Sequence, residues 1–222
     1  MFEDKDYLMK MIKEFTISLG KIMGLKAENK IEESQEALND TLKYVTELNI
    51  EVIEALPYDI LIHKVSGNRL FNTGKHLMLG ELLIQQADIF EIKGEKSRAK
   101  NLYWKSLNIL INIFLCGDAL ASEEDKSRID ELIEKIGWFN LPNESKLSLF
   151  QYYELTNKYA KAEDVLFDLI KTTEVNQDIL TKGIDFYERL INKDPDDLEK
   201  GNLPMDEVSE GLATLREYQK KQ

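Results

Sequence analysis

The sequence has little cysteine and little histidine. Its 222 residues include one cysteine, Cys116, which excludes an internal disulfide and a zinc site built on several cysteines. Cys116 ends the most apolar stretch of the chain, so we expect a buried, unreactive thiol. The two histidines, His63 and His76, do not stand in a spacing typical of metal-binding helices. The sequence therefore predicts neither a metal site nor a cofactor.

Glycine and proline are also scarce, at 11 and 4 residues, and long stretches contain neither. This scarcity argues against a sandwich with many tight turns and favours helices. Hydrophobic residues make up 43% and charged residues 32% of the chain. Such a composition can bury a core and is not typical of disordered proteins.

Basic clusters are absent. The chain carries 29 basic and 41 acidic residues, a net charge of −12, and its lysines alternate with carboxylates. We therefore expect no binding to nucleic acid or to anionic membranes, both of which need grouped Lys and Arg. A basic or neutral partner fits better, although acidity also serves solubility. No apolar run reaches the roughly 20 residues of a membrane span, and the acidic N-terminus lacks a signal-peptide core, so we expect a cytoplasmic protein.

The stretch Leu102–Cys116 is the most apolar part of the chain. Eleven of its fifteen residues are apolar, and they lie on every side of a helical projection. A surface helix has a single apolar stripe, whereas a helix that is apolar all round is buried by neighbours on several sides. The pattern predicts the central helix of an all-α fold.

Apolar residues elsewhere recur at steps of three and four, which predicts about nine or ten antiparallel helices. We interpret residues 1–222 as a single all-helical domain, with N-terminal helices in 1–72, a core in 73–172 and C-terminal helices in 173–222. The first helix, near Asp6–Gly24, has one apolar face. That face suits packing within its own domain and is also a candidate for homodimerisation. It contains Leu8, Met11, Ile12, Phe15, Leu19, Ile22 and Met23.

One pattern of small and aromatic residues occurs twice, each time around a turn residue, Gly94 or Asn157. A small residue lets two antiparallel helices approach closely, and an aromatic ring fills the space beside it. The pattern resembles the tetratricopeptide repeat, which implies a stacked helical array with a peptide-binding groove. The two copies are 63 residues apart rather than about 34, so we expect an irregular, tetratricopeptide-like array. The copies are Ala87, Phe90, Ala99, Tyr103 and Ser106, and Phe150, Tyr153, Ala162, Leu166 and Leu169.

The two ends of the chain carry a second resemblance. Residues 6–12, 184–190 and 198–212 are similar to the termini of a family of uncharacterised proteins from Gram-positive bacteria. That family is a domain of unknown function with a tetratricopeptide-like middle. The resemblance implies a bacterial, cytoplasmic, helical protein and assigns no functional residue.

Two loops resemble ligand-binding motifs and fail on spacing. Residues 67–76 (GNRLFNTGKH) have six residues between the glycines, and His76 follows Lys75 where a phosphate loop has Ser or Thr. Residues 194–201 have the charge of a calcium loop, but Leu198 and Glu199 stand where an oxygen ligand and a glycine are needed. We interpret this second segment as a helix end followed by a capped restart.

These observations favour a non-catalytic helical scaffold that binds a protein or peptide segment. Four tyrosines are candidates for the aromatic part of its groove, with burial in the core as the alternative for each. A small-ligand sensor or regulatory domain is the second hypothesis, and an enzyme is the third and least favoured, because no catalytic motif is present. The four tyrosines are Tyr103, Tyr152, Tyr153 and Tyr159.

Overall fold

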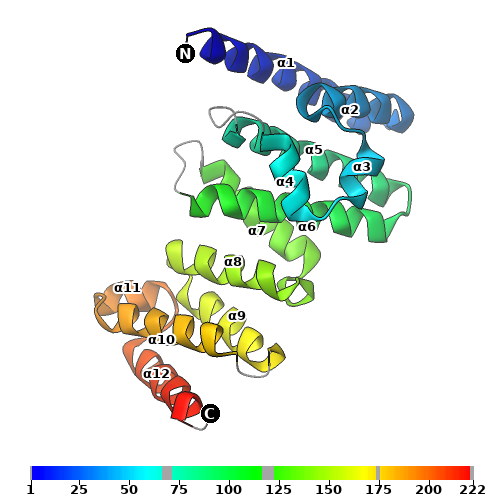
Figure 1. The fold of residues 1–222 in the computed structure, drawn as a ribbon. Helices are drawn as coiled ribbons and strands as arrows, with labels where there is room; N and C mark the ends of the chain where they lie inside the picture. The colour runs from blue at the N-terminus through cyan, green and yellow to red at the C-terminus, as the bar shows by residue number, and fades with distance from the viewer. Residues whose placement is uncertain (1, 67–71, 117–122, 174–175, 221–222) are drawn as a thin grey trace. The chain divides into compact units, whose positions relative to one another are not determined.

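The structure is a computed structural model that describes residues 2–66, 72–116, 123–173 and 176–220 (Figure 1). Within these ranges the chain forms twelve α-helices and one short 3-10 helix, and it contains no strand. The predicted all-α class is confirmed. The helices outnumber the predicted nine or ten because residues 50–66 form two short helices and Pro195–Lys200 forms a helix of its own.

The chain divides into two compact units, Met1–Ile136 and Gly137–Gln222. This boundary coincides with neither of the predicted boundaries, at residues 72 and 172. The first unit contains α1 (Phe2–Ala27), α2 (Ile31–Thr46), α3 (Ile50–Ala55), α4 (Tyr58–Ser66), α5 (Asn72–Ile92), α6 (Lys96–Leu115) and α7 (Glu123–Ile136). The second contains η2 (Trp138–Asn140), α8 (Asn143–Leu155), α9 (Tyr159–Thr172), α10 (Gln177–Ile191), α11 (Pro195–Lys200) and α12 (Met205–Lys220).

Helix α6 is the central helix of the first unit, as predicted. It packs against α3, α5 and α7, and eleven of its twenty residues are buried. The buried residues include Lys105. Its ammonium donates to the backbone carbonyls of Ile53, Glu54 and Leu56 at 2.7–2.9 Å. The prediction of a buried Cys116 is wrong. The helix ends at Leu115, and Cys116 lies just beyond it with an exposed thiol.

Three helical hairpins close with the same turn: α1–α2, α5–α6 and α8–α9 (Figure 1). The turn residues are Asn29, Gly94 and Asn157, each with a positive φ of 57–79°. In each hairpin the next amide donates to a carbonyl five residues earlier, the hydrogen bond that defines a Schellman ending. These bonds join Lys30 to Leu25, Glu95 to Phe90 and Lys158 to Tyr153, at 2.8–2.9 Å.

A small buried residue follows each of these turns by five positions. It is Ser34 in the first hairpin, Ala99 in the second and Ala162 in the third. A small side chain here lets the two helices approach closely, and the Ser34 hydroxyl also donates to the carbonyl of Ile22 at 3.0 Å. The sequence pattern located the second and third hairpins. It missed the first, because Leu25 stands where the others have an aromatic ring.

The second unit is built around buried aromatic rings. Phe150 and Phe186 lie edge to face with their centroids 5.2 Å apart, and the Tyr187 hydroxyl donates to Glu163 at 2.5 Å. Glycine allows the closest approaches. A Cβ at Gly201 would lie 2.2 Å from the ring of Tyr159.

Candidate functional site

A hollow of the first unit lies between α1, α5 and α7 and has a volume of about 670 Å³. Helices α1 and α7 form its walls and α5 forms its floor. Leu110 of α6 also contributes to the floor. The lining is mostly apolar, with polar groups gathered on the α7 side. The residues are Ile12, Phe15, Thr16, Leu19 and Met23 of α1, Gly74, Leu77, Met78 and Glu81 of α5, Leu110 of α6, and Ser127, Arg128 and Glu131 of α7.

The apolar residues of α1 cover two adjacent faces of the helix, one buried inside the unit and one directed at the hollow. Met11 and Ile22 are buried inside the unit, whereas Ile12 and Met23 line the hollow and remain 38% and 45% exposed. Phe15 lies between these two and is half-buried. The wall supplied by α1 is thus apolar and open to solvent.

The three helices around the hollow run in the same direction. Glu81 of α5 pairs with Arg128 of α7. Two helical turns further toward the C-terminal end of both helices, Asp88 pairs with Lys135. The same end of α5 meets Lys26, close to the C-terminal end of α1. The hollow therefore follows the helix axes, with its apolar part near Leu77.

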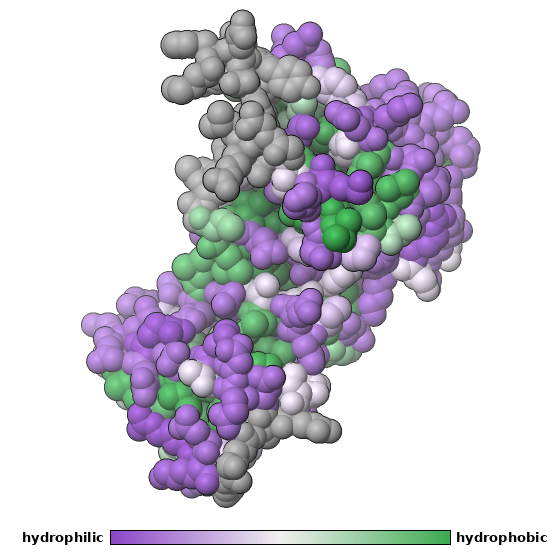
Figure 2. Space-filling model, in the orientation of Figure 1, coloured by the Kyte–Doolittle hydropathy of each residue, from purple (hydrophilic) through white to green (hydrophobic). Residues whose placement is uncertain are grey.

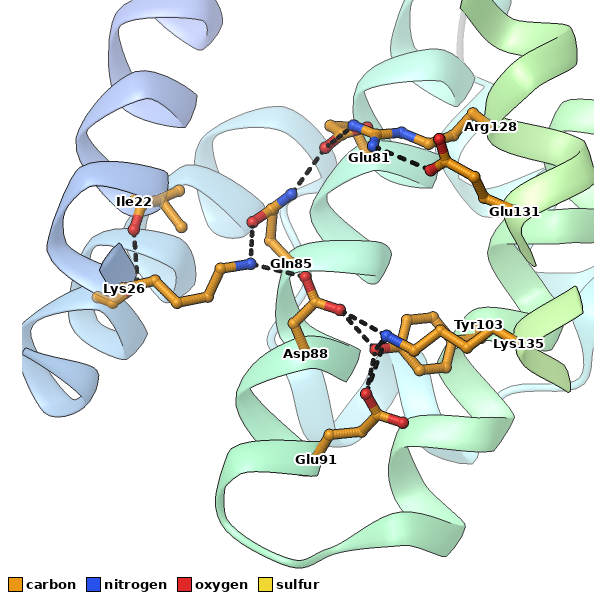
Figure 3. Close-up of polar contacts among 11 residues, drawn as sticks. Ile22, Lys26, Glu81, Gln85, Asp88, Glu91, Tyr103, Arg128, Glu131 and Lys135 are labelled. Atoms are coloured by element: carbon orange, nitrogen blue, oxygen red, sulfur yellow. Dashed lines mark hydrogen bonds and ion pairs between the residues drawn. The ribbon is translucent and has the colours of Figure 1, made fainter. Parts of the chain in front are cut away.

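A network of charged side chains connects α1, α5 and α7 on the C-terminal side of Glu81 (Figure 3). The Lys26 ammonium donates to Gln85 and to Asp88, both at 2.6 Å, and so ties α1 to α5. On its other side Asp88 accepts from Lys135 of α7 at 3.1 Å. The network links both walls to the floor at this end of the hollow.

Tyr103 of α6 extends the network into the core. Its hydroxyl donates to Asp88 at 2.5 Å, lies 3.1 Å from a carboxylate oxygen of Glu91, and accepts from Lys135. The Lys135 ammonium also lies 4.1 Å from the centroid of the Tyr103 ring, a cation–π contact. Arg128 closes the polar end of the hollow, because its guanidinium donates to both carboxylate oxygens of Glu81 at 3.0 Å.

The network shifts the pKa of Asp88 and the pKa of Tyr103. Burial alone would raise the pKa of the Asp88 carboxyl, but hydrogen bonds from Lys26 and Tyr103 outweigh it and lower this pKa. Burial, together with the bond to Asp88, raises the pKa of Tyr103. Asp88 is thus held ionised and Tyr103 is held neutral. This charge arrangement suits a structural tie, because each member already has its partners.

The four candidate groove tyrosines do not line the hollow. Tyr103 belongs to the first unit, and Tyr152, Tyr153 and Tyr159 belong to the second. All four are buried, with exposed fractions of 0–3%. This burial agrees with the stated alternative, in which each ring lies in the core. Tyr152, Tyr153 and Tyr159 lie within five residues of the turn at Asn157, where aromatic rings fill the space between two helices.

The other motifs found in the sequence form no site among the described residues. His63 lies exposed on α4, and burial lowers the pKa of His76, whose Nε2 lies 3.3 Å from the Ser66 hydroxyl. The loop 67–71 lies outside the described residues. Asp194 caps α11 by accepting from the amide of Asp196 at 2.9 Å, so the helix end and capped restart are confirmed. Within the ranges given above, no cluster of three or more His, Cys, Asp or Glu could hold a metal ion.

Sequence reasoning missed the hollow because its lining combines α1 with α5, α6 and α7, and three other helices separate α1 from these in the chain. The α1 side carried a signal, since Ile12, Phe15, Leu19 and Met23 all belonged to the predicted apolar face. The α5 side of the hollow carried a weaker sequence signal. On α5, Glu81, Gln85 and Asp88 follow one another at steps of four and three, which marks a polar stripe on one face of the helix.

A second apolar area lies over α3 and α4 (Figure 2). Val52 of α3 and Ile60 of α4 are exposed there. It is a surface area rather than a hollow. We therefore take the hollow between α1, α5 and α7 as the candidate site.

Comparison with known proteins supplies a family and no activity. None of the described helices combines the length and apolar character needed to cross a bilayer. The search of curated proteins and the search of solved structures each returned no match. Residues 1–220, nearly the whole chain, match a family described as a family of unknown function, DUF6483. The predicted membership of an uncharacterised family is thereby confirmed, and the chain belongs to the DUF6483 family.

Proposed function

We propose that this protein is a non-catalytic helical scaffold that binds a peptide or protein segment in the hollow between α1, α5 and α7. The observation that carries the proposal is the half-exposed apolar wall of α1, which faces a hollow of about 670 Å³. An exposed apolar patch rimmed by polar residues is typical of an interaction site.

The shape of the hollow supports a segment as its occupant. Three helices run side by side in one direction, so the hollow is elongated along their axes. An amphipathic helix can lie in such a groove with apolar residues at steps of three and four toward α1 and Leu77. Its polar side would then meet Ser127 and Glu131 on α7. With a chain charge of −12, a segment with basic flanks is favoured over an acidic one.

The proposal includes a tetratricopeptide-like arrangement of the helices. The shared turn at Asn29, Gly94 and Asn157 and the small residue five positions later support it, since both recur in three hairpins. In such arrays the first helix of each pair faces the groove. Helices α1 and α5, which are the first helices of their hairpins, both line the hollow.

The test compares a filled hollow with an open one. Ser127 is exposed on the α7 side of the hollow, so Ser127→Trp fills the space without removing a core residue. Ser209→Trp, on exposed α12 in the other unit, is the matched control. A display library of helical peptides of about 16 residues is selected against the unaltered protein, and affinities are measured by fluorescence anisotropy.

We expect the selected peptides to share an apolar stripe with basic flanks. They should bind the Ser127→Trp variant at least about tenfold more weakly, a loss of roughly 1.4 kcal/mol, and bind the Ser209→Trp variant normally. Equal binding to both variants would refute the hollow as the site. Failure to enrich any peptide would refute a peptide as the occupant.

A small apolar ligand is the second candidate. The volume of about 670 Å³ lies inside the range of about 300–1,000 Å³ that ligand pockets occupy, and the lining is mostly apolar with a few polar groups. Native mass spectrometry of the purified protein distinguishes this candidate. A bound small molecule that is absent from the Ser127→Trp variant would favour it over a peptide.

A further inference from the structure

The polar groups that line the hollow are not balanced in charge. Glu81, Arg128 and Glu131 supply two carboxylates and one guanidinium, which leaves one negative charge over. The other polar lining residues, Thr16 and Ser127, are neutral. A charge that is left over at the edge of an apolar site favours ligands of the opposite charge. The position of this charge therefore bears on which segment the hollow accepts.

Arg128 and Glu81 are already matched to each other. The Arg128 guanidinium donates to both carboxylate oxygens of Glu81 at 3.0 Å, and Gln85 donates to one of these oxygens at 2.8 Å. The Glu81 side chain is mostly buried, with 18% of it exposed. Hydrogen bonds that join both oxygens of a carboxylate to a guanidinium are strong and directional. A ligand would have to break this pair to use either group.

Glu131 is the carboxylate that remains available. Figure 3 shows it beside Arg128, but its Oε2 lies 3.7 Å from the Nη1 of Arg128, beyond hydrogen-bond distance. Its side chain is 64% exposed, and it accepts no hydrogen bond from any residue that the structure describes. Ser127 precedes it by four positions on α7, so the two side chains lie on the same face of the helix. The charge that is left over thus belongs to Glu131.

An apolar lining with one carboxylate at its edge matches the side chain of lysine or arginine. Both residues place an apolar stem along an apolar surface and keep the charged head at the edge of that surface. In this hollow the stem can lie against Leu77 and Leu110, and the head can pair with Glu131. An acidic side chain at the same place would meet Glu131 as a like charge.

We propose that Glu131 selects a lysine or arginine in the segment that the hollow binds, at the position where the apolar stripe of the segment meets α7. This inference rests on the proposed function, because Glu131 lines the same hollow. It goes further in placing one basic residue inside the contact, in addition to basic flanks. Segments that have the apolar stripe but carry an acidic residue at that position are rejected.

The test asks whether the charge at one protein position decides the charge that is selected in a peptide. The display library of helical peptides is selected separately against the unaltered protein, Glu131→Lys and Glu134→Lys. Glu134→Lys is the matched control, because Glu134 is exposed on the same helix outside the lining of the hollow, and its substitution changes the charge of the chain equally. Thermal unfolding shows that each variant is folded before selection.

We expect the unaltered protein and Glu134→Lys to enrich lysine or arginine beside the apolar stripe, and Glu131→Lys to enrich glutamate or aspartate there. A peptide selected by the unaltered protein should bind Glu131→Lys at least about fivefold more weakly, and this loss should shrink as salt is added. The same peptide with glutamate in place of its basic residue should bind Glu131→Lys more tightly than it binds the unaltered protein.

The outcomes separate this inference from the proposed function. Enriched peptides that lose affinity for Ser127→Trp, but show one charge preference against all three proteins, would overturn the role of Glu131 and leave the hollow as the binding site. A switch of preference caused equally by Glu134→Lys would also overturn it, because the net charge of the chain would then be the cause. Acidic residues enriched by the unaltered protein would show that Arg128 is read instead. Failure to enrich any peptide would overturn the proposed function and this inference together.

Discussion

Asp88 of α5 and Lys26 of α1 form an ion pair of 2.6 Å, just beyond the polar end of the hollow. Both side chains are mostly buried, and Asp88 also accepts from Tyr103 and Lys135. Replacing Asp88 with Asn removes the anion that three donors share. We expect Asp88→Asn to lower the free energy of unfolding by about 1–3 kcal/mol in urea denaturation. Asp40→Asn, on the exposed side of α2, should change it by less than about 0.5 kcal/mol.

The same ion pair predicts a pH dependence. The pKa of Asp88 is lower in the folded chain than in the unfolded chain, so the folded state binds this proton less tightly. The stabilisation that the Asp88 carboxylate contributes is therefore complete above the pKa of Asp in the unfolded chain, near 3.9. It declines as the pH falls through the pKa of Asp88 in the folded chain. The stability difference between the unaltered protein and Asp88→Asn should stay constant from neutral pH down to about 5 and shrink below about 4. A difference that grew on acidification would contradict the assignment.

We expect substitution of the buried Lys105 to lower the stability of the protein strongly. Its ammonium satisfies three backbone carbonyls around the end of α3, where few other donors are available. Lys105→Met keeps the length of the side chain but leaves these carbonyls without the donor. We expect a loss of about 2–4 kcal/mol, measured by thermal and urea unfolding. Lys100→Met on the exposed side of the same helix should be nearly neutral.

Two glycines predict opposite outcomes for one substitution. At Gly201 an added Cβ would lie 2.2 Å from the ring of Tyr159 and 2.9 Å from the carbonyl of Asn157, so Gly201→Ala should destabilise the second unit by about 1–3 kcal/mol. At Gly20 the space is open, so Gly20→Ala should stabilise α1 by about 0.5–1 kcal/mol. Calorimetry of both variants at low protein concentration measures the two effects. Shifts of the same sign would show that the surroundings of one glycine are misassigned.

The end of α2 offers a stabilising change. Glu47 caps this helix with a φ of 61°, a conformation that costs a side chain about 1–2 kcal/mol but costs glycine little. We expect Glu47→Gly to raise the free energy of unfolding by about 0.5–1 kcal/mol. Glu36→Gly in the middle of α2 should lower it by a similar amount. A Glu47→Gly variant as unstable as Glu36→Gly would contradict the left-handed cap.

The sequence predicted the parts of this fold that depend on local patterns. The apolar stretch near Leu102 identified the central helix, and the residues around Gly94 and Asn157 identified two of the three similar hairpins. The candidate site could not be predicted in the same way. Tyr103 was assigned to a groove because its hairpin pattern resembles a known repeat, yet the same pattern buries the ring. The hollow depends on how α1, α5 and α7 come together, and no short segment records that arrangement.

The shared hairpin turn also bears on how the chain folds. Each hairpin joins neighbouring stretches of sequence through a three-residue connection, so its helices can meet without closing a long loop. Domains dominated by such local contacts fold in microseconds to milliseconds. The tie between Lys26 and Asp88 spans 62 positions and joins one hairpin to the next, so we expect it to form after the hairpins themselves. We therefore expect the hairpins to assemble during synthesis, in order from the N-terminus, and the hollow to be completed only when α7 arrives.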